Sequence, residues 1–316
     1  MMETILITGG TGLIGKKLSQ MLTAKGYKVI ILSRSMPGEK INENTDYAVW
    51  NIKNETIDEE AFAKADHIIH LAGAGVAEKR WTAKRKQEIV NSRVKSGNLI
   101  VKYIREKPNK IKTIISSSAI GWYGPDTNES LKTGFTEDAP AANDFLGQTC
   151  YDWENAIQPA KEAGKRLVIL RTGIVLSNHG GAFKEFKNPL KFGVAAILSS
   201  GKQIISWIHI DDICRMYIQA LESSNMKGIY NAIATVPVSN KEMVLALAKK
   251  FRNNFIAIHV PSFILKIVLG KMSIEVLKST TASCNKIKNA GFHFLYPTLD
   301  AALTALKKED EDAKKI

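Results

Sequence analysis

Cysteine is scarce in this sequence, with three residues among 316, at Cys150, Cys214 and Cys284. An odd, widely spaced set provides neither a disulfide framework nor the paired spacing of a metal site. Disulfide-rich chains belong to oxidising compartments, and this chain does not resemble them. We therefore expect no metal site and a reduced, cytoplasmic protein.

Long hydrophobic runs are also missing. None approaches the ~20 residues that a membrane span requires, and the longest, Pro261–Gly270, is interrupted by Lys266. The N-terminus reads Met-Met-Glu-Thr, without the basic region or the small-residue cleavage site of a signal peptide. We therefore expect no membrane partner.

Acidic residues are outnumbered, because 31 Asp and Glu face 44 Lys and Arg, which gives a net charge of +13. The excess permits an anionic partner, but charge spread along a chain is usual for a solvated surface, and no nucleic-acid-binding motif accompanies it. The sequence thus argues against nucleic acid as a partner and leaves the oligomeric state open. A hydrophobic content of 45% is ample for a packed core.

Short apolar runs alternate with amphipathic stretches along most of the chain. Runs typical of buried strands cover Thr4–Thr8, Lys28–Ser33, Tyr47–Trp50, His67–Ala72, Ile111–Ser116, Arg166–Arg171, Trp207–Ile210 and Gly228–Ile233. Helical spacing covers Ile14–Lys25, Asp58–Lys64, Thr82–Lys107, Asp152–Ala163, a stretch through Leu221, Lys241–Phe251 and Ser273–Ser279. This order predicts an α/β fold, a doubly wound parallel Rossmann sheet covered by helices on both faces.

A glycine-rich turn over residues 8–15, Thr-Gly-Gly-Thr-Gly-Leu-Ile-Gly, joins the first strand to the first helix. In this context Gly9 suits a tight turn, Gly12 lets the backbone approach a pyrophosphate, and Gly15 permits close helix–strand packing. The helix N-terminus then offers its N–H groups to the phosphates. We expect the cofactor to be contacted by Gly9, Thr11, Gly12, Leu13 and Ile14.

The end of the second strand lacks the acid that NAD-binding Rossmann sites place on the ribose 2′-hydroxyl. It reads Leu32-Ser33-Arg34-Ser35. The guanidinium of Arg34 suits a forked contact with a 2′-phosphate, and Ser33 can add a hydrogen bond. The alternative is that Arg34 is an ordinary surface residue. We predict that the cofactor is NADP(H).

After Leu176 the alternation loosens, and Gly180-Gly181 opens an irregular stretch that reaches Gly201. We therefore expect an NADP(H)-binding Rossmann domain of residues 1–175 and about 203–235. A smaller C-terminal substrate lobe, of about 176–202 and 236–306, should lie over the carboxyl edge of the sheet, where open α/β folds bind ligands. The charged residues 307–316 predict a solvated tail.

Further short segments carry a specific combination of motifs. They are Leu71-Ala72-Gly73-Ala74, Arg80-Trp81, Asn91-Ser92-Arg93, residues 116–124 (Ser-Ser-Ser-Ala-Ile-Gly-Trp-Tyr-Gly), Trp153-Glu154, residues 170–176 (Leu-Arg-Thr-Gly-Ile-Val-Leu), Gly180-Gly181, residues 206–212 (Ser-Trp-Ile-His-Ile-Asp-Asp), Gly291-Phe292 and Ala301-Ala302-Leu303. With the glycine turn, they resemble an atypical subgroup of the extended short-chain dehydrogenases/reductases, the "epimerase family" of NAD-dependent epimerase/dehydratase-like proteins. The resemblance covers nearly the whole chain and implies the fold and an NADP(H) site, whereas the reaction of this subgroup is largely undefined.

The resemblance also implies further positions near the cofactor. Leu71 and Ala72, followed by Gly73, should line the adenosine side. The stretch Thr172–Val175 should pass beside the nicotinamide half, through Thr172, Gly173 and Val175. Glu88 and Arg93 match subgroup positions near the cofactor, although each also fits a solvated charge on a helix.

Active members of the superfamily use a Tyr and, one helical turn later, a Lys as their acid–base pair. The only Tyr-x-x-x-Lys here runs from Tyr103 to Lys107 and precedes the serine-bearing fifth strand, so we interpret it as a chance match. Tyr151 has Asn155 at the following turn, and Asn supplies no positive charge. The sequence therefore lacks the usual pair.

The family helix carries a Glu about four residues beyond the Lys, and Glu154 fits that place. The Tyr position then falls on Leu146 and the Lys position on Cys150. Leu has no proton to exchange, and Cys150 has no evident base. Epimerase or dehydrogenase activity by the usual mechanism is therefore in doubt.

Three polar residues remain as catalytic candidates. Ser117 and Ser118 lie where the superfamily keeps its substrate-orienting hydroxyl, although serines at a strand end can equally satisfy backbone groups. His209, between Ile208 and Ile210, is either a hydrogen-bonded structural histidine or a proton donor to the substrate.

For four other side chains the sequence predicts a place in the structure. Trp122 and Tyr123 either face the mouth of the pocket or pack between the lobes. Asp211 and Asp212 should cap the helix that begins there.

Two functions remain in view. The first is an NADP(H)-binding oxidoreductase or epimerase-like protein that acts on a small hydroxyl- or carbonyl-bearing substrate. The second is a non-catalytic NADP(H)-binding scaffold or redox sensor.

Overall fold

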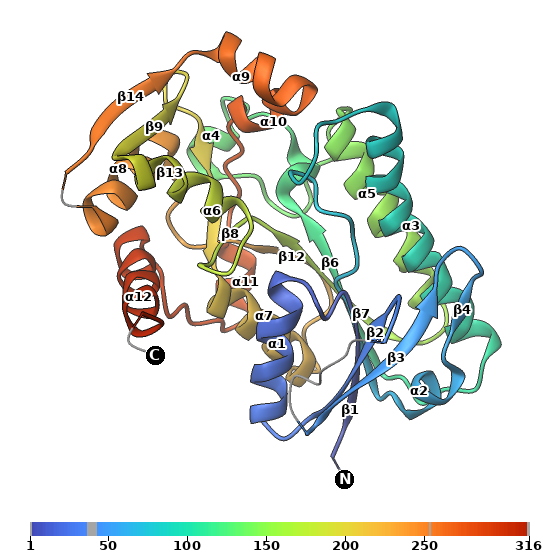
Figure 1. The fold of residues 1–316 in the computed structure, drawn as a ribbon. Helices are drawn as coiled ribbons and strands as arrows, with labels where there is room; N and C mark the ends of the chain where they lie inside the picture. Colours follow the sequence, from blue (N-terminus) through green and yellow to red (C-terminus); the bar gives the residue numbers. More distant parts are fainter. Residues whose placement is uncertain (1, 37–42, 253, 315–316) are drawn as a thin grey trace.

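An eight-stranded sheet forms the centre of the molecule in the computed structural model, which describes residues 2–36, 43–252 and 254–314. Its strands lie in the order β12-β7-β6-β5-β1-β2-β3-β4 (Figure 1). They are β1 (Thr4–Thr8), β2 (Lys28–Ser33), β3 (Thr45–Asn51), β4 (Thr56–Ile57), β5 (His67–His70), β6 (Thr113–Ala119), β7 (Arg166–Thr172) and β12 (Gly228–Ala232). All neighbours pair in parallel except β3 and β4. The predicted doubly wound parallel sheet is thus confirmed.

Helices cover both faces of this sheet because alternate strand residues point to opposite sides. Ile5 and Ile7 belong to the core under α1 (Leu13–Ala24) and α7 (Ile210–Glu222). Leu6 belongs to the core under α2, α3 and α5. These three helices are Glu59–Lys64, Ala83–Glu106 and Phe145–Ile157. Figure 1 shows α3 and α5 side by side on one face and α1 beside α7 on the other.

Helix α5 begins earlier than the sequence predicts. It was expected from Asp152 but starts at Phe145, because the side chain of Asp144 accepts a hydrogen bond from the N–H of Gly147 at 2.8 Å. This is a standard N-cap contact, which satisfies one of the free N–H groups of a first helical turn. The helix ends at Ile157, and a 3-10 turn, η2 (Gln158–Ala160), follows.

The second lobe is built from short elements that surround a core of its own. Its small sheets pair β8 (Ile174–Leu176) with β11 (Trp207–His209), β9 (Val194–Leu198) with β14 (Ile256–Val260), and β10 (Ile204–Ile205) with β13 (Val238–Ser239). The helices of this half are α6 (Ala182–Lys187), η3 (Pro189–Phe192), α8 (Asn240–Phe251), α9 (Ser262–Leu269), η4 (Gly270–Met272), α10 (Ser273–Leu277), α11 (Asn285–Asn289) and α12 (Leu299–Asp312). Two short helices, η1 (Ile120–Tyr123) and α4 (Ser130–Thr133), follow β6.

The chain crosses between the two parts more than once. Trp207 and Ala234 pack in the core of the second lobe with Phe183, Met243 and Leu303. Conversely, Ala282, Ile287 and Phe292 pack in the core beneath α1 and α7. The division into two domains by residue ranges stays a prediction.

The charged end of the chain continues α12. The helix runs past Lys307, where we expected a solvated tail, as far as Asp312. Leu306 is buried, and Glu309 accepts a hydrogen bond from Asn178 at 2.8 Å. The first part of the expected tail is therefore a packed helix.

Within the described ranges, no helix combines the length and hydrophobicity needed to cross a bilayer. All three cysteines are free thiols and are buried.

Candidate active site

The candidate residues gather at one edge of the sheet. Because β1, β2, β5, β6 and β7 are parallel, their carboxyl ends emerge together, with β1 between β2 and β5. The candidates at these ends are Gly9, Thr11, Gly12, Leu13 and Ile14 after β1, Ser33 and Arg34 at the end of β2, Leu71, Ala72 and Gly73 after β5, Ser117 and Ser118 in β6, and Thr172 and Gly173 at the end of β7. Val175 lies in β8, His209 in β11, and Glu88 and Arg93 on α3.

The glycine turn is packed too tightly for larger residues at two of its positions. A Cβ added at Gly9, whose φ is +69°, would lie 2.8 Å from the carbonyl carbon of Leu71. One added at Gly15 would lie 2.4 Å from the carbonyl oxygen of Gly9. The turn therefore touches both the segment after β5 and the first turn of α1, as the predicted roles of these glycines require.

The N-terminus of α1 is open. Gly12 is its N-cap, no side chain caps it, and no acidic residue lies in its first turn. The free N–H groups of this turn and the positive end of the helix dipole suit an anion. A Cβ at Gly12 would meet only the carbonyl oxygen of Gly9, at 3.2 Å, so glycine keeps space clear there. This cradle fits a pyrophosphate.

A buried polar network fixes the neighbouring strand end. The Thr8 hydroxyl accepts hydrogen bonds from the N–H groups of Leu71 and Ala72, both at 3.2 Å, and lies 2.7 Å from Nδ1 of His70. With its oxygen accepting from the backbone, Thr8 donates to Nδ1, so the ring proton sits on Nε2, 3.3 Å from the Ser96 hydroxyl. Burial lowers the pKa of His70 to about 3, which keeps the ring neutral.

Sequence reasoning did not find this network. A signal was present, since His70 ends a fully buried strand, directly after two isoleucines, and a buried imidazole needs hydrogen-bond partners. The network holds Leu71 and Ala72 against the glycine turn.

The end of β2 presents a cation to solvent. Ser33 is the last residue of the strand and is half-buried, and Arg34 directly after it is exposed. No acid stands at this position. Among the residues that the structure describes, this places a cation beside the carboxyl end of β2.

Arg93 and Glu88, both on α3, differ in burial and in their contacts. Arg93 is buried, donates from Nη1 to the carbonyl of Ala74 at 3.0 Å, and lies over the ring of Trp153 at 4.8 Å. A Cβ at Gly73 would lie 3.0 Å from the Arg93 guanidinium carbon. Arg93 thus supports the loop after β5, whereas Glu88 is half-exposed and pairs with Arg85 at 2.8 Å, as a solvated helix charge does.

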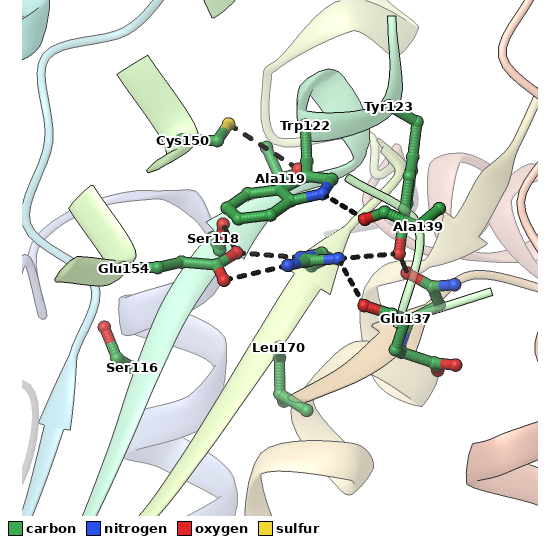
Figure 2. A network of polar contacts seen from close by, with 12 residues as sticks. Ser116, Ser118, Ala119, Trp122, Tyr123, Glu137, Ala139, Cys150, Glu154 and Leu170 are labelled. Carbon is green, nitrogen blue, oxygen red and sulfur yellow. Dashed lines mark hydrogen bonds and ion pairs between the residues drawn. The ribbon is translucent and has the colours of Figure 1, made fainter. Parts of the chain in front are cut away.

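A buried ion pair lies below the end of β6. Arg171 is 1% exposed and Glu154 3%, and their contacts are 2.8 Å (Nε to Oε1) and 3.0 Å (Nη2 to Oε2). The guanidinium carbon lies 3.7 Å from the ring centre of Trp122. Nη1 donates to the Tyr123 hydroxyl at 3.1 Å and to the carbonyl of Glu137 at 3.0 Å. Figure 2 shows Trp122, Tyr123, Glu137 and Glu154 around this centre.

Sequence reasoning missed this pair. Arg171 lies within the buried run of β7, one residue before its end, and a buried charge requires a partner, which is a usable signal. The partner itself, on α5, follows only from the packing of helix on sheet.

Ser118 belongs to the same network (Figure 2). Its hydroxyl donates to Oε1 of Glu154 at 2.7 Å, so its proton is committed and only its lone pairs remain for a ligand. Ser117, the next residue of the strand, points to the other face of the sheet, and its hydroxyl contacts the carbonyl of Ser118 at 3.4 Å. The two serines therefore do not form a joint donor pair.

The expectation that Tyr123 faces the pocket mouth is wrong. It is 4% exposed, stacks on Phe135, and donates to Oδ1 of Asn231 at 2.6 Å. Burial raises the pKa of Tyr123 to about 12, despite the nearby Arg171. Trp122 packs on Arg171 and donates to the carbonyl of Ala139, so the packing alternative holds for both aromatic residues.

The positions of the usual acid–base pair hold no acid or base. Cys150 is buried, its thiol contacts the carbonyl of Ala119 at 3.6 Å, and burial raises its pKa to about 12. A Cβ at Gly121 in η1 would lie 3.2 Å from Cβ of Leu146, so this side chain packs against η1. Tyr151 is 46% exposed, with its ring 6.1 Å from that of Trp122.

His209 is the N-cap of α7, which corrects the expectation that Asp211 and Asp212 cap this helix. Its Nδ1 accepts a hydrogen bond from the N–H of Asp211 at 3.1 Å. Asp212 instead accepts from the N–H groups of Leu295 and Tyr296, both at 2.9 Å. His209 is the last residue of β11 and directly precedes α7, so its side chain lies beside the free N–H groups of the first helical turn.

The second ring nitrogen of His209 is unused. Nε2 is buried with no hydrogen-bond partner among the described residues, and burial lowers the pKa of the ring. In the neutral ring Nδ1 accepts, so Nε2 carries the proton. His209 is therefore structural through Nδ1 and retains a free donor at Nε2.

The segment after β7 closes the site from the other lobe. Val175 pairs with Ile208, and a Cβ at Gly173 would lie 2.5 Å from the carbonyl oxygen of Ser206. A Cβ at Gly181 would lie 3.1 Å from Cδ2 of Leu13, which places this loop against the start of α1. Within the described ranges, no three His, Cys, Asp or Glu residues are grouped to hold a metal ion.

The chain matches known protein families and curated relatives over most of its length. The model of the NAD dependent epimerase/dehydratase family matches residues 5–232, and a domain of unknown function, DUF1731, matches residues 260–306. Epimerase family protein YfhF of Bacillus subtilis is 35% identical over 96% of this chain and 97% of its own length. Epimerase family protein SSP1921 of Staphylococcus saprophyticus is 33% identical over 96% and 99%.

Solved structures are similar over almost the whole chain. Human epimerase family protein SDR39U1, solved with NADPH, has a TM-score of 0.83 at 27% identity and covers 96% of this chain and 99% of its own. UDP-glucuronic acid 4-epimerase from Bacillus cereus has a TM-score of 0.78 at 20% identity, with 98% and 99% covered. At that identity the second likeness concerns the fold alone.

Proposed function

The chain belongs to the NAD-dependent epimerase/dehydratase family, in the atypical extended short-chain dehydrogenase subgroup, and from this we propose that it binds NADP(H) at the carboxyl edge of the sheet. We further propose that it is an oxidoreductase or epimerase-like protein for a small hydroxyl- or carbonyl-bearing substrate in the cytoplasm. The carrying observation is the exposed cation Arg34 directly after β2, with no Asp or Glu among residues 33–36. The NADPH bound by the human relative supports this choice of cofactor.

Each group of candidate residues would contact a different part of the cofactor. The open N-terminus of α1, with Gly9, Thr11, Gly12, Leu13 and Ile14, would hold the pyrophosphate. Ser33 and Arg34 would hold the 2′-phosphate. Leu71, Ala72 and Gly73 would line the adenosine, and Thr172, Gly173 and Val175 the nicotinamide half. Arg93, which supports the loop at Gly73, and Glu88 on the same helix would lie near the cofactor.

When bound, the nicotinamide supplies or accepts a hydride. The chain's own part is to orient the substrate and handle a proton without a Tyr–Lys pair. Ser118, whose proton is committed to Glu154, can accept a hydrogen bond from a substrate hydroxyl. Nε2–H of His209 has no hydrogen-bond partner among the described residues and would be a second group that contacts the substrate.

The proposal is tested by exchanging the charge at Arg34. In Arg34→Asp the 2′-phosphate would meet an anion, so NADPH affinity should fall at least tenfold while NADH affinity changes by less than about threefold. Lys53→Asp, at an exposed turn between β3 and β4, is the matched control and should change neither. An unchanged ratio of affinities in Arg34→Asp would refute the assignment.

A second candidate, a non-catalytic NADP(H)-binding scaffold or redox sensor, is favoured by one observation. The Tyr and Lys positions hold a packed Leu146 and a buried Cys150 thiol, so the usual proton relay is missing. Incubation with NADPH and a panel of small aldehydes, ketones and sugars separates the two. Substrate-dependent NADPH oxidation supports the enzyme, whereas binding without any oxidation supports the scaffold.

A further inference from the structure

Large apolar side chains are exposed at one end of the second lobe. We call this surface the α9 face and define it by Phe192, Ile256, Phe263, Ile264, Ile267 and Val268. Their exposed fractions are 85%, 72%, 61%, 39%, 69% and 60%. Ile256 donates its N–H to the carbonyl of Gly193 at 2.8 Å, which joins β14 to the segment that carries Phe192. Figure 1 shows β14 and α9 together at the end of the molecule farthest from the N-terminus.

Helix α9 gains little from burial within this chain. Its sequence is Ser-Phe-Ile-Leu-Lys-Ile-Val-Leu, and only Leu265 is buried. An apolar helix is ordinarily covered, because leaving such side chains in water costs roughly 1.5–3 kcal/mol each relative to burial. Exposed large apolar side chains that gather on one element, instead of being scattered singly, mark an interaction site.

The charge around the α9 face has one sign. Residues 243–274 contain no Asp or Glu, and they include Lys249, Lys250, Arg252, Lys266 and Lys271. Lys266 and Lys271 are exposed within and directly after α9.

The first acid after this stretch does not offset the charge. Glu275 pairs with Lys278 at 2.5 Å, and their side chains are only 14% and 10% exposed. Glu78, in the loop that meets α9 through Arg80, shares the cation Arg85 with Glu88, so Arg85 offsets its charge only in part. The α9 face itself carries Lys266 and Lys271 and no acid. The face therefore combines exposed apolar side chains with positive charge.

We propose that the α9 face docks this protein on an anionic phospholipid surface. Helix α9 would lie along the surface, with Phe263, Ile267 and Val268 inserted at the acyl boundary and Lys266 and Lys271 beside the lipid phosphates. The cytoplasmic leaflet of a membrane carries such negative charge. The expectation of no membrane partner rests on the missing span, and a helix that lies on a surface needs none.

The same charge argues against a second copy of the chain as the occupant. In a twofold dimer the patch meets its own copy, so neither copy would bring an acid to pair with Lys266 and Lys271. Like charges opposed across an interface disfavour association. An anionic lipid surface instead complements both properties of the face.

Docking requires no rearrangement of the fold. Arg80 donates from Nη2 to the carbonyl of Ile267 at 2.7 Å. Leu269, the last residue of α9, and Met272 in η4 pack with Trp81. The helix is thus fixed on the loop before α3 while its apolar side chains stay outside.

The test is flotation of the full chain with two kinds of vesicle. We expect it to bind vesicles of phosphatidylglycerol mixed with phosphatidylcholine, and to bind phosphatidylcholine alone at least tenfold more weakly. The double variants Phe263→Ser/Ile267→Ser and Lys266→Glu/Lys271→Glu should each weaken binding to the anionic vesicles at least tenfold. Leu295→Ser and Lys53→Glu, exposed residues elsewhere, are matched controls and should bind as the parent does.

Circular dichroism and NADPH titration should be unchanged in all variants, because these side chains are exposed and lie outside the cofactor residues. Absence of vesicle binding by the parent overturns the proposal, as does equal binding to neutral and anionic vesicles. Dimerisation that Phe263→Ser/Ile267→Ser abolishes, without vesicle binding, would assign the face to a second copy instead. Any of these failures leaves the NADP(H) assignment intact, since that is tested at Arg34.

Discussion

At the scale of single residues, the charges buried beneath the candidate site are the most constrained feature. Arg171 and Glu154 are almost wholly shielded from water and meet through two hydrogen bonds. Taking both ions out of water is costly, and their attraction offsets that cost only while both are present. Arg171 contacts Trp122, and Glu154 accepts the hydrogen bond of Ser118, so the pair fixes both side chains. Removing either charge would leave the other one buried without a partner.

Glu154→Gln should lower the free energy of unfolding by about 3–5 kcal/mol, because it leaves the Arg171 guanidinium buried without a counter-charge. Glu162→Gln is the matched control. Its partner Arg105 is at the surface, so the change should stay within about 1 kcal/mol. Urea denaturation measures both, and equal effects of the two substitutions would contradict the account.

His70 should make the stability depend on pH. Its pKa is about 3 in the folded protein because of burial, against about 6.5 in the unfolded chain. Between these values the unfolded chain binds a proton that the folded chain does not, so stability is fully present above pH 6.5 and falls as the pH falls. The slope contributed by this residue is about 1.4 kcal/mol per pH unit.

The check is urea denaturation of the parent and of His70→Gln between pH 7 and pH 4.5. The variant should lose about 1.4 kcal/mol less per pH unit than the parent below pH 6. His67 and His209, whose pKa values burial also lowers, are present in both proteins and cancel in the comparison. Parallel pH profiles would show that His70 is not neutral and buried.

Tyr151→Phe should change any NADPH-linked turnover by less than about tenfold, because a working general acid contributes roughly 10²–10⁴-fold. Tyr151 is half-exposed and has Asn155, not a Lys, one turn later. Steady-state kinetics measure the effect, with Ser118→Ala and His209→Gln assayed beside it. A hundredfold loss in the variant, together with parent turnover that rises at alkaline pH, would mean that Tyr151 does transfer the proton.

At the scale of elements, the turn between β1 and α1 contains one glycine that the fold requires, Gly15, and one that we assign to phosphate binding, Gly12. Gly12 has φ −78° and ψ −180°, which any residue adopts, and a Cβ there meets one atom at 3.2 Å. Gly15 has no such room, since its Cβ would lie 2.4 Å from the carbonyl oxygen of Gly9. Substitution at the two positions should therefore fail in different ways.

Gly12→Val should fold and lose at least a hundredfold in NADPH affinity, because its branched side chain fills the space through which a phosphate reaches the N–H groups of α1. Gly15→Val should instead lose the fold itself. Circular dichroism and fluorescence titration distinguish the two results. A folded Gly12→Val protein with parental affinity would remove the phosphate site from this turn.

The strands of the sheet could be predicted from the sequence because each is a short apolar run, and β1 and β2 have the expected bounds. Helix α5 could not be placed as well. Its first two turns contain Gly147 and Thr149, poor helix formers, and the start depends on the Asp144 cap and on packing against α3. A tertiary contact outweighed local propensity there.

Part of the candidate site could likewise be predicted from the sequence, and part depends on tertiary packing. The glycine turn and Arg34 are adjacent in sequence to strand ends, so the order of the strands brings them to one edge. The pairing of Arg171 with Glu154, and the use of the Ser118 proton by that Glu, connect β6, β7 and α5. No spacing in the sequence encodes those contacts, because helix packing on the sheet creates them.

At the scale of the whole molecule, two parts meet over the carboxyl edge of the sheet. The sheet supplies the glycine turn and Arg34, and the segment from Gly173 to Gly181 reaches back to Leu13 from the other lobe. Cofactor binding at this junction should stabilise the whole chain. NADPH at a hundredfold excess over its dissociation constant should add about 2.7 kcal/mol to the free energy of unfolding.

The central claim is that this site selects NADP(H), and calorimetric titration of the unmodified chain with NADPH and NADH, in the same buffer, tests it most directly. The 2′-phosphate is the only difference between the two ligands, and Arg34 is the residue assigned to it. The account predicts that NADPH binds at least tenfold more tightly than NADH, about 1.4 kcal/mol or more. Equal affinities, or tighter binding of NADH, would contradict it.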